Sequence, residues 1–552
     1  MLFCASPFCL ARRPLSSKIR DAIGYVNIKM SKYRENKIHL GIRKRLNERL
    51  SRFKVSQGVL TRVQQFRLKW QKRGTPDGIG TPVRWANIAS TLHRISPFCQ
   101  GTDFDVYADT GEAFRLMWDA VDSATKNIRW ATYICKNDHV GRETVHRLVN
   151  AARRGVTVQF IYDDAGNIGG REELLRPLKN EPNVHVMCFN PVLPRMLRYF
   201  TTFRWKTSPG IRNHRKILLV DDAIAFVGGL NIGNEYAGKR CGGSGLYRDT
   251  MCRVSGVIVE QIREAFDEIM STTENSSNRK QVRFARQRER IEKLLKTPGR
   301  SFIRSVTEMR KRRLLRKEWQ KGLQISENGS GKLTQLLTSN AWMRNYGIQK
   351  AYQIVMNRSR HRIWITTPYF LPTRRLLRAV LRAGKRGVDV RIITGSVRTT
   401  DPLLMWWGSQ YIVHKLLTHN IKLYEYEGEP LPNREKLDMG LERRVRKMHA
   451  KTIVVDGVWS AIGSYNLDVL SNKLLEISVA SIDYSLASEF ESQFKKDMLA
   501  SRLISQDTFQ SRSMLQRVLI VVIYYIGRAI EKVSFWSFSH PEVETTLDES
   551  DV

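Results

Sequence analysis

The stretch that decides the fold is Asn213-His214-Arg215-Lys216-Ile217-Leu218-Leu219-Val220-Asp221. It has the pattern His-x-Lys-x4-Asp, and the pattern returns at His449-Ala450-Lys451-Thr452-Ile453-Val454-Val455-Asp456. Each copy leads into a Gly-x-x-Asn sequence whose Asn lies ten residues after the Asp, at Asn231 and Asn466. One copy alone would be weak evidence for a functional site, but two copies with the same continuation indicate a duplicated functional unit.

The apolar residues inside each copy form a short run bounded by a turn signal, Asp-Asp in the first copy and Asp-Gly in the second. We expect buried strands that lead into hairpins. Side chains two apart on a strand share a face, so His214 and Lys216 should point the same way, as should His449 and Lys451. Two such strands side by side would gather two imidazoles, two ammonium groups and two amides in one pocket.

Such a pocket suits phosphoryl transfer, because positive charge and hydrogen-bond donors stabilise the phosphoryl oxygens. One imidazole can attack phosphorus, and the other can protonate the leaving oxygen and then deprotonate the incoming hydroxyl. This chemistry needs no metal and no cofactor. A metal site is disfavoured, because a Lys two residues from each His repels a cation and no Cys or second His lies at ligand spacing. Two structural core histidines are the simpler interpretation of one copy, but not of a duplicated one.

These residues resemble the phospholipase D superfamily with its paired HKD motifs, and most closely its bacterial-type cardiolipin synthases. The resemblance is carried by the two motifs and by four further matches, and it covers about residues 102 to 500 with one insertion. The further matches are Val227 to Tyr236, Tyr247-Arg248-Asp249-Thr250, Thr366 to Pro372, and the continuation of the second motif from His449 through Asp468. Two departures are a segment before Glu476 that is one residue short, and the absence of the N-terminal transmembrane pair of many bacterial members.

The resemblance implies the site residues. Candidate catalytic residues are His214, Lys216, Asp221, His449, Lys451 and Asp456. Of these, we expect the two aspartates to brace loops rather than to do chemistry. Candidate phosphate-binding residues are Asn231, Asn466 and Ser464. A carboxylate usually orients a catalytic imidazole, and the resemblance assigns Asp249 to His214 and Glu476 to His449.

The two halves alternate strands and helices in the same order, which predicts an α/β fold. The elements expected are helices at 113–124, 143–154, 348–357 and 373–384, and strands at 128–134, 156–162, 363–367 and 388–394. We therefore expect two repeated phospholipase D-like domains that form a pseudodimer, each a mixed β-sheet flanked by helices. Tyr133 and Tyr369 end equivalent strands, where they either line the mouth of the site or belong to the core.

We divide the chain into six segments. They are a basic N-terminal targeting or amphipathic region (1–73), a linker (74–101), the first phospholipase D-like domain (102–271), a basic helical insertion (272–335), the second phospholipase D-like domain (336–500), and a C-terminal apolar interfacial helix with an acidic tail (501–552). The basic helical patterns at 38–72 and 283–321 fit either an anionic membrane contact or an ordinary solvated helix.

The C-terminal run Val518 to Ile526 has nine apolar residues, fewer than the ~20 that span a bilayer. Arg517, Arg528 and Lys532 flank it and Trp536 follows, which favours an interfacial helix over a buried core helix.

The formal net charge of +39 and the pI near 10.2 call for an acidic partner, either an anionic membrane or nucleic acid. Because the charge lies mostly outside the repeat and apolar segments suit lipid, we expect an anionic membrane surface and no nucleic acid. The seven Cys are scattered, which argues for reduced thiols. The Arg-rich, acid-poor start, with no acid before Asp21, resembles a mitochondrial transit peptide, although a disordered basic tail is the alternative. We therefore expect a mitochondrial protein associated with the inner membrane.

By resemblance, the expected activity is phosphatidyl transfer between two phosphatidylglycerol molecules, giving cardiolipin and glycerol through a phosphatidyl-histidine on His214. CDP-diacylglycerol stays open as the donor. A phospholipase D or a phosphatidylglycerophosphate synthase with the same site is the alternative, and a nuclease is less favoured.

Overall fold

The structure is a computed structural model that describes residues 82–167, 171–191, 210–274, 332–341, 343–401, 403–436, 442–506 and 513–536. The expected N-terminal region, residues 275–331 of the expected insertion and the acidic tail lie outside these residues. Expectations for those segments, including the basic helices at 38–72 and 283–321, therefore stay predictions.

The first half alternates strands and helices as its sequence predicts. Its elements are α3 (Pro82–Leu92), β1 (Phe98–Tyr107), α4 (Thr110–Asp122), β2 (Asn127–Thr132), α5 (His139–Arg153), β3 (Thr157–Asp163), α6 (Arg171–Lys179), β4 (Val184–Phe189), β5 (Ile217–Val220), β6 (Ile224–Gly228), η1 (Lys239–Cys241), β7 (Tyr247–Arg248), β8 (Met251–Ser255) and α8 (Ile258–Glu274). Side chains cap two of these helices at the N-terminus: Asp109 accepts from the Gly111 N–H at 2.9 Å, and Asp138 accepts from the Gly141 N–H at 2.9 Å.

The second half repeats this order. Its elements are β9 (Lys332–Asn340), β10 (Asn345–Tyr346), α11 (Gly347–Arg358), β11 (Arg362–Thr366), α12 (Arg374–Lys385), β12 (Asp389–Gly395), α13 (Leu403–Leu417), β13 (Lys422–Tyr426), β14 (Pro430–Lys436), β15 (Glu442–Val445), β16 (Lys447–Met448), β17 (Thr452–Val455), β18 (Trp459–Gly463), η2 (Ser471–Lys473), β19 (Leu475–Ile482), α14 (Tyr484–Leu499), β20 (Ser501–Leu503) and α16 (Met514–Trp536). All eight helices and strands expected in the repeat are present within a few residues of their expected bounds.

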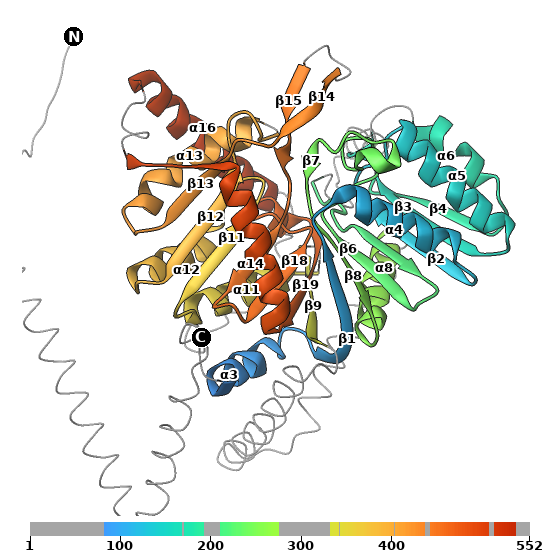
Figure 1. The fold of residues 1–552 in the computed structure, drawn as a ribbon, viewed down its shortest axis with the longest axis horizontal. Helices are drawn as coiled ribbons and strands as arrows, with labels where there is room; N and C mark the ends of the chain where they lie inside the picture. The colour runs from blue at the N-terminus through green and yellow to red at the C-terminus, as the bar shows by residue number, and fades with distance from the viewer. Residues whose placement is uncertain are drawn as a thin grey trace, which may run out of the picture. The chain divides into compact units, whose positions relative to one another are not determined.

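The two halves share one β-sheet across the described residues. Its order is β20-β13-β12-β11-β17-β18-β19-β9-β1-β8-β6-β5-β2-β3-β4, with β10 paired to β9. From β13 to β4 the order is mirrored about the antiparallel pair β9–β1, so each half contributes the same arrangement outward from the junction, and the second half adds β20 at its edge (Figure 1). The motif strands occupy equivalent positions, because β5 pairs antiparallel with β2 and β6 while β17 pairs antiparallel with β11 and β18.

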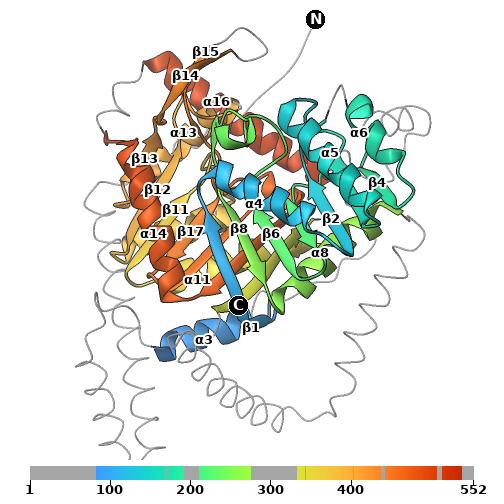
Figure 2. The ribbon, with the colours of Figure 1, turned by 45° about the vertical axis from the view of Figure 1, so that its right-hand side comes forward.

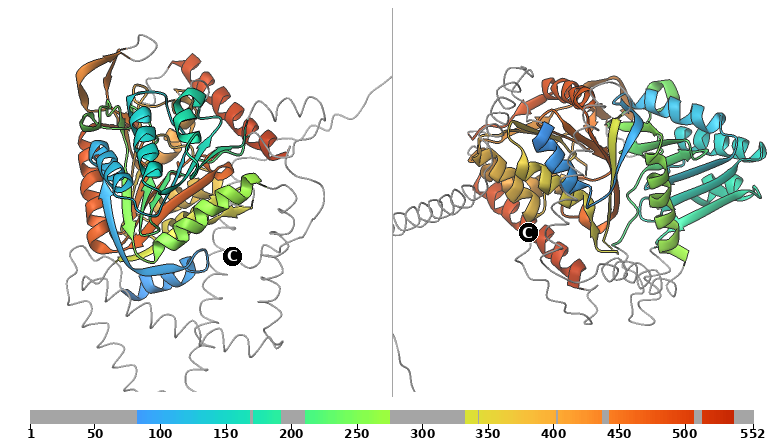
Figure 3. Two further views of the ribbon diagram at one scale, coloured as in Figure 1. Left: turned by 90° about the vertical axis from the view of Figure 1, so that its right-hand side faces the viewer. Right: turned by 90° about the horizontal axis from the view of Figure 1, so that it is seen from below.

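The central core lies between the halves. Strands β18 and β19 pack on β6 and β8, and apolar side chains from both sets of strands form one buried cluster with α8 and α14. In the view from below in Figure 3, the first half lies to the right of this boundary and the second half to the left. Helices α4, α5 and α6 cover the outer face of the first half, and α3, α11, α12 and α13 cover that of the second (Figures 1 and 2). The pseudodimer expected from the repeat is therefore one packed unit.

Residues 82–101, expected as part of a linker, instead form α3 and the start of β1. Trp85, Ile88 and Leu92 of α3 are buried in the core of the second half. Their helical spacing was hidden among Gly, Pro and Thr turn signals. The other domain limits shift slightly, because β9 begins inside the expected insertion at Lys332 and β20, beyond residue 500, pairs with β13.

Candidate active site

Each motif lies just before a buried strand and runs against the backbone of the other half. The His214 N–H donates to the carbonyl of Leu475 at 3.0 Å, and the His449 N–H donates to the carbonyl of Arg248 at 2.9 Å. The first contact precedes β5, while the second continues the parallel pair β16–β7. The opposite half therefore fixes the position of each histidine.

The carboxylates that hold the imidazoles come from the opposite halves as well. His214 Nδ1 lies 3.0 and 3.1 Å from the two oxygens of Glu476, and His449 Nδ1 lies 2.5 Å from Asp249 Oδ2. The expected pairing, Asp249 with His214 and Glu476 with His449, is therefore wrong. It followed the order of the chain, whereas the packing of β19 and β8 between the halves decides which acid reaches which ring. Because the carboxylate engages Nδ1 in both pairs, the Nε2 atom of each histidine is available to react with a substrate.

The two acids are supported differently at equivalent positions. Ser464 Oγ donates to Glu476 Oε2 and accepts from the N–H of Ile477 at 3.1 Å. The equivalent residue in the first half is Gly229, where a Cβ atom would lie 2.1 Å from an Asp249 oxygen. Asp249 therefore needs glycine beside it, while Glu476 uses a hydroxyl. The structure places Ser464 against an acid that holds a catalytic ring.

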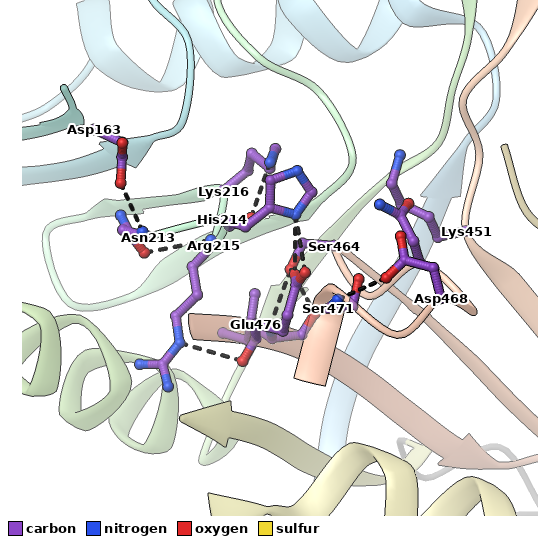
Figure 4. A network of polar contacts seen from close by, with 12 residues as sticks. Asp163, Asn213, His214, Arg215, Lys216, Lys451, Ser464, Asp468, Ser471 and Glu476 are labelled. Carbon is purple, nitrogen blue, oxygen red and sulfur yellow. Dashed lines mark hydrogen bonds and ion pairs between the residues drawn. The ribbon is translucent and has the colours of Figure 1, made fainter. Parts of the chain in front are cut away.

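Both motif lysines are buried beside their histidines. Lys216 Nζ donates to the carbonyl of His214 at 2.9 Å and lies 5.4 Å from the centre of the Tyr133 ring. Lys451 Nζ donates to the carbonyl of His449 and lies 2.9 Å from its Nδ1. Burial lowers the pKa of Lys216 to about 7 and that of Lys451 to about 8, although nearby carboxylates oppose the effect. Figure 4 shows Lys216 and Lys451 on either side of the His214 ring.

Burial also decides the protonation of the rings. It lowers the pKa of His214 well below its ordinary value, and the charges of Lys216 and Lys451 act in the same direction. Burial, followed by the Lys451 charge, lowers the pKa of His449 to about 4, and the charge of Asp249 opposes both. The pocket therefore favours uncharged imidazoles and keeps its positive charge on the lysines.

The two carboxylates respond to burial in opposite ways. Burial would raise the pKa of Asp249, but the charges of Lys451 and His449 outweigh it and hold that pKa below its ordinary value. Burial raises the pKa of Glu476 to about 8, against the opposing charge of Lys216 and the Ser464 hydrogen bond. Asp249 is therefore ionised near neutral pH. Glu476 becomes ionised only to the extent that Lys216 and Ser464 offset the effect of burial on its pKa.

The two asparagines lie on the loops that follow β6 and β18. Asn231 Oδ1 accepts from the N–H of Ile134 at 3.2 Å, and Asn466 Nδ2 donates to the hydroxyl of Tyr369 at 3.0 Å. Among the described residues, the buried Oδ1 of Asn466 has no hydrogen-bond partner. These contacts hold the amides at equivalent strand ends, while their expected contact with phosphate stays a prediction.

The motif aspartates lie at the far ends of the motif strands from the histidines. Asp221 accepts from the N–H groups of residues 125, 126 and 127 at 2.7 to 3.0 Å. Asp456 accepts from those of residues 360 to 362 and from the Arg84 guanidinium. Both have positive φ, 54° and 56°. The structure therefore places Asp221 and Asp456 where they brace neighbouring backbone, at the ends of the motif strands that lie away from the histidines.

Tyrosine rings pack beside both motif histidines. The Tyr133 ring lies 5.2 Å from that of His214, and the rings of Tyr236 and Tyr247 lie 5.7 and 5.2 Å from that of His449. Tyr133 thus contacts the site. Tyr236 and Tyr247 were missed as site residues, although both lie in the segments that carry the family resemblance.

Three further residues beside the site were also missed. Arg212 and Lys447 each lie two residues before a histidine and are paired with an acid, Asp163 and Asp401 respectively. A basic residue at this position in both copies was the available signal. Asp468, buried near Lys451 (Figure 4), accepts from the Ser471 N–H at 2.6 Å, and burial raises its pKa to about 7.

Within the part of the chain that the structure describes, no three His, Cys, Asp or Glu side chains gather closely enough to hold a metal ion.

Comparison with known proteins gives the same family that the two motifs resemble. A family model described as "Cardiolipin synthase, PLD-like domain" matches residues 117–270 and 352–498. A cardiolipin synthase of Clostridium perfringens strain 13 is 26% identical over 426 residues, which cover 77% of this chain and 76% of that protein. A cardiolipin synthase of Geobacillus sp. strain WCH70 is 27% identical over 435 residues, covering 78% and 74% of the two chains.

Among solved structures, a phosphatidylserine synthase of Haemophilus influenzae Rd KW20 aligns with a TM-score of 0.54. It shares 14% sequence identity and covers 82% of this chain and 99% of that one, which supports the same fold.

Proposed function

Because the chain belongs to the family of cardiolipin synthases with phospholipase D-like domains, we propose that it is a phosphatidyltransferase that makes cardiolipin. One observation carries the chemistry: a buried imidazole (His214) and a partly exposed one (His449), each held through Nδ1 by a carboxylate of the other half, share a pocket with two buried lysines. Such a site suits two successive in-line displacements at phosphorus. The donor and the acceptor are both phosphatidylglycerol.

In the first step, His214 Nε2 attacks the phosphorus of one phosphatidylglycerol. The bond from phosphorus to the glycerol headgroup breaks, and a protonated His449 gives its Nε2 proton to the departing glycerol oxygen. For the attack, Nδ1–H of His214 donates to an ionised Glu476, a form that Lys216 and Ser464 favour because both lower the pKa of Glu476. In the free pocket the pKa of His449 is about 4, so its ring is uncharged there. The ionised Asp249 raises that pKa, and the negative charge of a bound phosphodiester acts in the same direction, so together they favour the protonated ring that the acid step needs.

In the second step, a hydroxyl of another phosphatidylglycerol loses its proton to His449, and its oxygen displaces His214 from phosphorus. The phosphorus–nitrogen bond breaks, cardiolipin leaves, and His449 is again protonated. Lys216, Lys451, Asn231 and Asn466 hold the phosphoryl oxygens during both steps, where charge develops.

The activity is tested with purified protein in liposomes that contain labelled phosphatidylglycerol, with and without CDP-diacylglycerol, beside His214→Ala. We expect cardiolipin and glycerol from phosphatidylglycerol alone, and neither from the variant. Cardiolipin only when CDP-diacylglycerol is present would change the donor. Phosphatidic acid as the sole product would make the protein a phospholipase D instead.

The attacking residue is tested by trapping. Quenching the reaction in acid-free denaturant and digesting the protein should yield a phosphatidylated peptide that contains His214. A modified peptide that contains His449 instead would reverse the two roles.

We also propose that the protein works at the mitochondrial inner membrane, on a surface of anionic lipid. The Arg-rich, acid-poor N-terminus and the net charge of +39 support this location. Residues 1–73 fused to a fluorescent protein should carry it into mitochondria. A fusion that stays in the cytosol would contradict the proposed location.

A further inference from the structure

The C-terminal helix α16 presents apolar side chains to the surface as well as to the protein. It has 23 residues, which gives a length of ~35 Å. The apolar side chains that remain exposed on it are Met514, Leu515, Val518, Leu519, Val521, Val522, Tyr525 and Ile526, each with 41 to 83% of its area accessible. A helix that is apolar on most of its circumference is normally buried, and so many exposed apolar side chains mark an interaction surface.

The inner side of α16 is fixed on α13. The ring of Tyr524 stacks on that of Tyr411 at 3.9 Å, the Tyr525 ring lies 5.8 Å from Tyr411, and Ile520 is only 4% exposed. Because α13 belongs to the second half of the sheet domain, α16 lies along the domain surface. Among the described helices, none is both long enough and apolar enough to cross a bilayer. Figure 3, left, shows α16 lying obliquely along one side of the protein.

Further apolar side chains are exposed at the start of α13, the helix on which α16 packs. Leu403 and Leu404 in the first turn of α13 are 45 and 58% exposed. Two residues earlier, Asp401 pairs with Lys447, which lies two residues before His449. The exposed turn is therefore tied to the segment that carries a catalytic histidine.

Positive charge accompanies these apolar side chains. Arg398, on the loop that leads into α13, and Arg517 of α16 are both exposed. Apolar side chains beside cationic ones match the boundary of a bilayer with anionic headgroups, where the apolar face lies below the headgroups and the cations lie among them. A second copy of the chain would carry the same positive charge and is less well matched.

We infer that α16 and the first turn of α13 form a docking platform that lies in the interface of an anionic bilayer, and that this platform holds the active site at the headgroups of its substrates. The inference rests on the proposed function only in naming those substrates. Docking itself needs no turnover, so it is measured separately.

Docking is tested with full-length Val522→Cys labelled with an environment-sensitive nitrobenzoxadiazole. The matched control is Leu499→Cys, at the end of α14, where the native side chain is 87% exposed. The unsubstituted chain treated with the same dye corrects for native thiols. On vesicles of phosphatidylglycerol and phosphatidylcholine, we expect emission at position 522 to rise at least twofold with a blue shift, and emission at position 499 to stay unchanged.

Equal responses at both positions, or none at position 522, would overturn the inference. It would also be overturned if emission at position 522 rose with protein concentration in the absence of vesicles and did not respond to them, because a second copy would then cover α16.

A second measurement compares turnover in two substrate states. Val518→Ser with Val522→Ser should lower cardiolipin formation on vesicles at least tenfold, while turnover of dispersed short-chain phosphatidylglycerol stays within twofold of the unsubstituted protein. Val257→Ser, at a side chain that is 64% exposed outside the platform, should change neither rate. Equal losses in both substrate states would contradict docking. Failure of the unsubstituted protein on dispersed substrate would count against the proposed function instead.

Discussion

Each histidine depends on a carboxylate that lies far away in the chain. His214 and Glu476 are separated by 262 residues, and His449 and Asp249 by 200. The sequence identified all four residues but paired them within halves, because the family resemblance assigned to each histidine the acid that lies downstream of it in the chain. The packing of strands from the two halves against each other decides the pairing, and no local sequence pattern indicates it. The motif aspartates, by contrast, make their backbone contacts within one half, Asp221 with residues 125–127 and Asp456 with residues 360–362, so a local bracing role could be predicted for them.

Ser464 should control the charge of Glu476. Its hydroxyl donates to this carboxylate and lowers the Glu476 pKa, and a hydrogen bond to a charged group is worth ~1.5–3 kcal/mol. In Ser464→Ala we expect the acid limb of kcat/KM to move up by about one pH unit, since a pKa unit corresponds to ~1.4 kcal/mol. Activity at pH 7 should fall several-fold and recover at higher pH.

The matched control is Ser460→Ala. Ser460 is a buried serine on β18 whose hydroxyl has no partner among the described residues. Its pH profile should match that of the unsubstituted protein. An unmoved acid limb in Ser464→Ala would mean that the hydroxyl does not stabilise the ionised carboxylate.

Asp468 should make the folded protein less stable as the pH rises. Burial raises its pKa from 3.8 to about 7, so the folded protein keeps a proton that the unfolded chain has already lost. The stabilisation is complete below pH 3.8 and is lost as the pH rises through about 7. Relative to Asp468→Asn, the unsubstituted protein should therefore lose on the order of 2 kcal/mol of unfolding free energy between pH 5 and 8.

Denaturant unfolding of both proteins at several pH values measures this difference. The asparagine keeps an oxygen that can accept from the Ser471 N–H, so the comparison isolates the charge. A difference in unfolding free energy that stays constant with pH would contradict a buried, protonated Asp468.

At the scale of helices and strands, the repeat was predictable because local signals agree with the fold. Side-chain caps such as Asp138 and Thr373 precede helices, and β-branched runs such as 452–455 form the buried motif strands. The residues of α3 were missed because Gly, Pro and Thr precede a helix whose apolar face finds its partner only in the second half. A helix whose partner lies more than two hundred residues away gives little local signal of its burial.

An ion pair joins α14 of the second half to β7, the short strand that ends just before Asp249. Arg248 donates to both oxygens of Asp497, at 2.9 and 2.8 Å, and both side chains are buried. In Asp497→Ala the guanidinium is left buried without its carboxylate, so we expect a loss of ~3–5 kcal/mol of unfolding free energy. Activity should fall too, because Arg248 adjoins Asp249.

Arg115→Ala is the contrasting variant. Arg115 pairs with Glu112 and Asp119 on the exposed face of α4, where water and salt screen both pairs, so we expect little loss of stability. Measured by denaturant unfolding, the loss of unfolding free energy in Asp497→Ala should therefore be several times larger than the loss in Arg115→Ala. Equal losses of stability would show that the contact between the halves is not a major source of stability.

For the whole molecule, the large sheet that both halves share and the buried cluster between the halves turn a duplicated sequence into one active site. The sequence predicted two domains that act together, but not the β9–β1 pair that joins their sheets. That pairing connects residues separated by more than two hundred positions, such as Phe98 and Gln335, and no local sequence pattern indicates it. Because each half supplies the acid for the other's histidine, neither half contains a complete histidine–carboxylate pair.

The most direct test of this crossed arrangement is the burst of p-nitrophenol released from phosphatidyl-p-nitrophenol. This substrate has a leaving group that needs no acid, so the burst reports formation of the covalent intermediate alone. It is measured in His214→Ala, His449→Ala, Glu476→Gln and Asp249→Asn. The account predicts that Glu476→Gln behaves like His214→Ala and that Asp249→Asn behaves like His449→Ala, whichever histidine attacks. The opposite grouping, with Glu476→Gln behaving like His449→Ala, would contradict it.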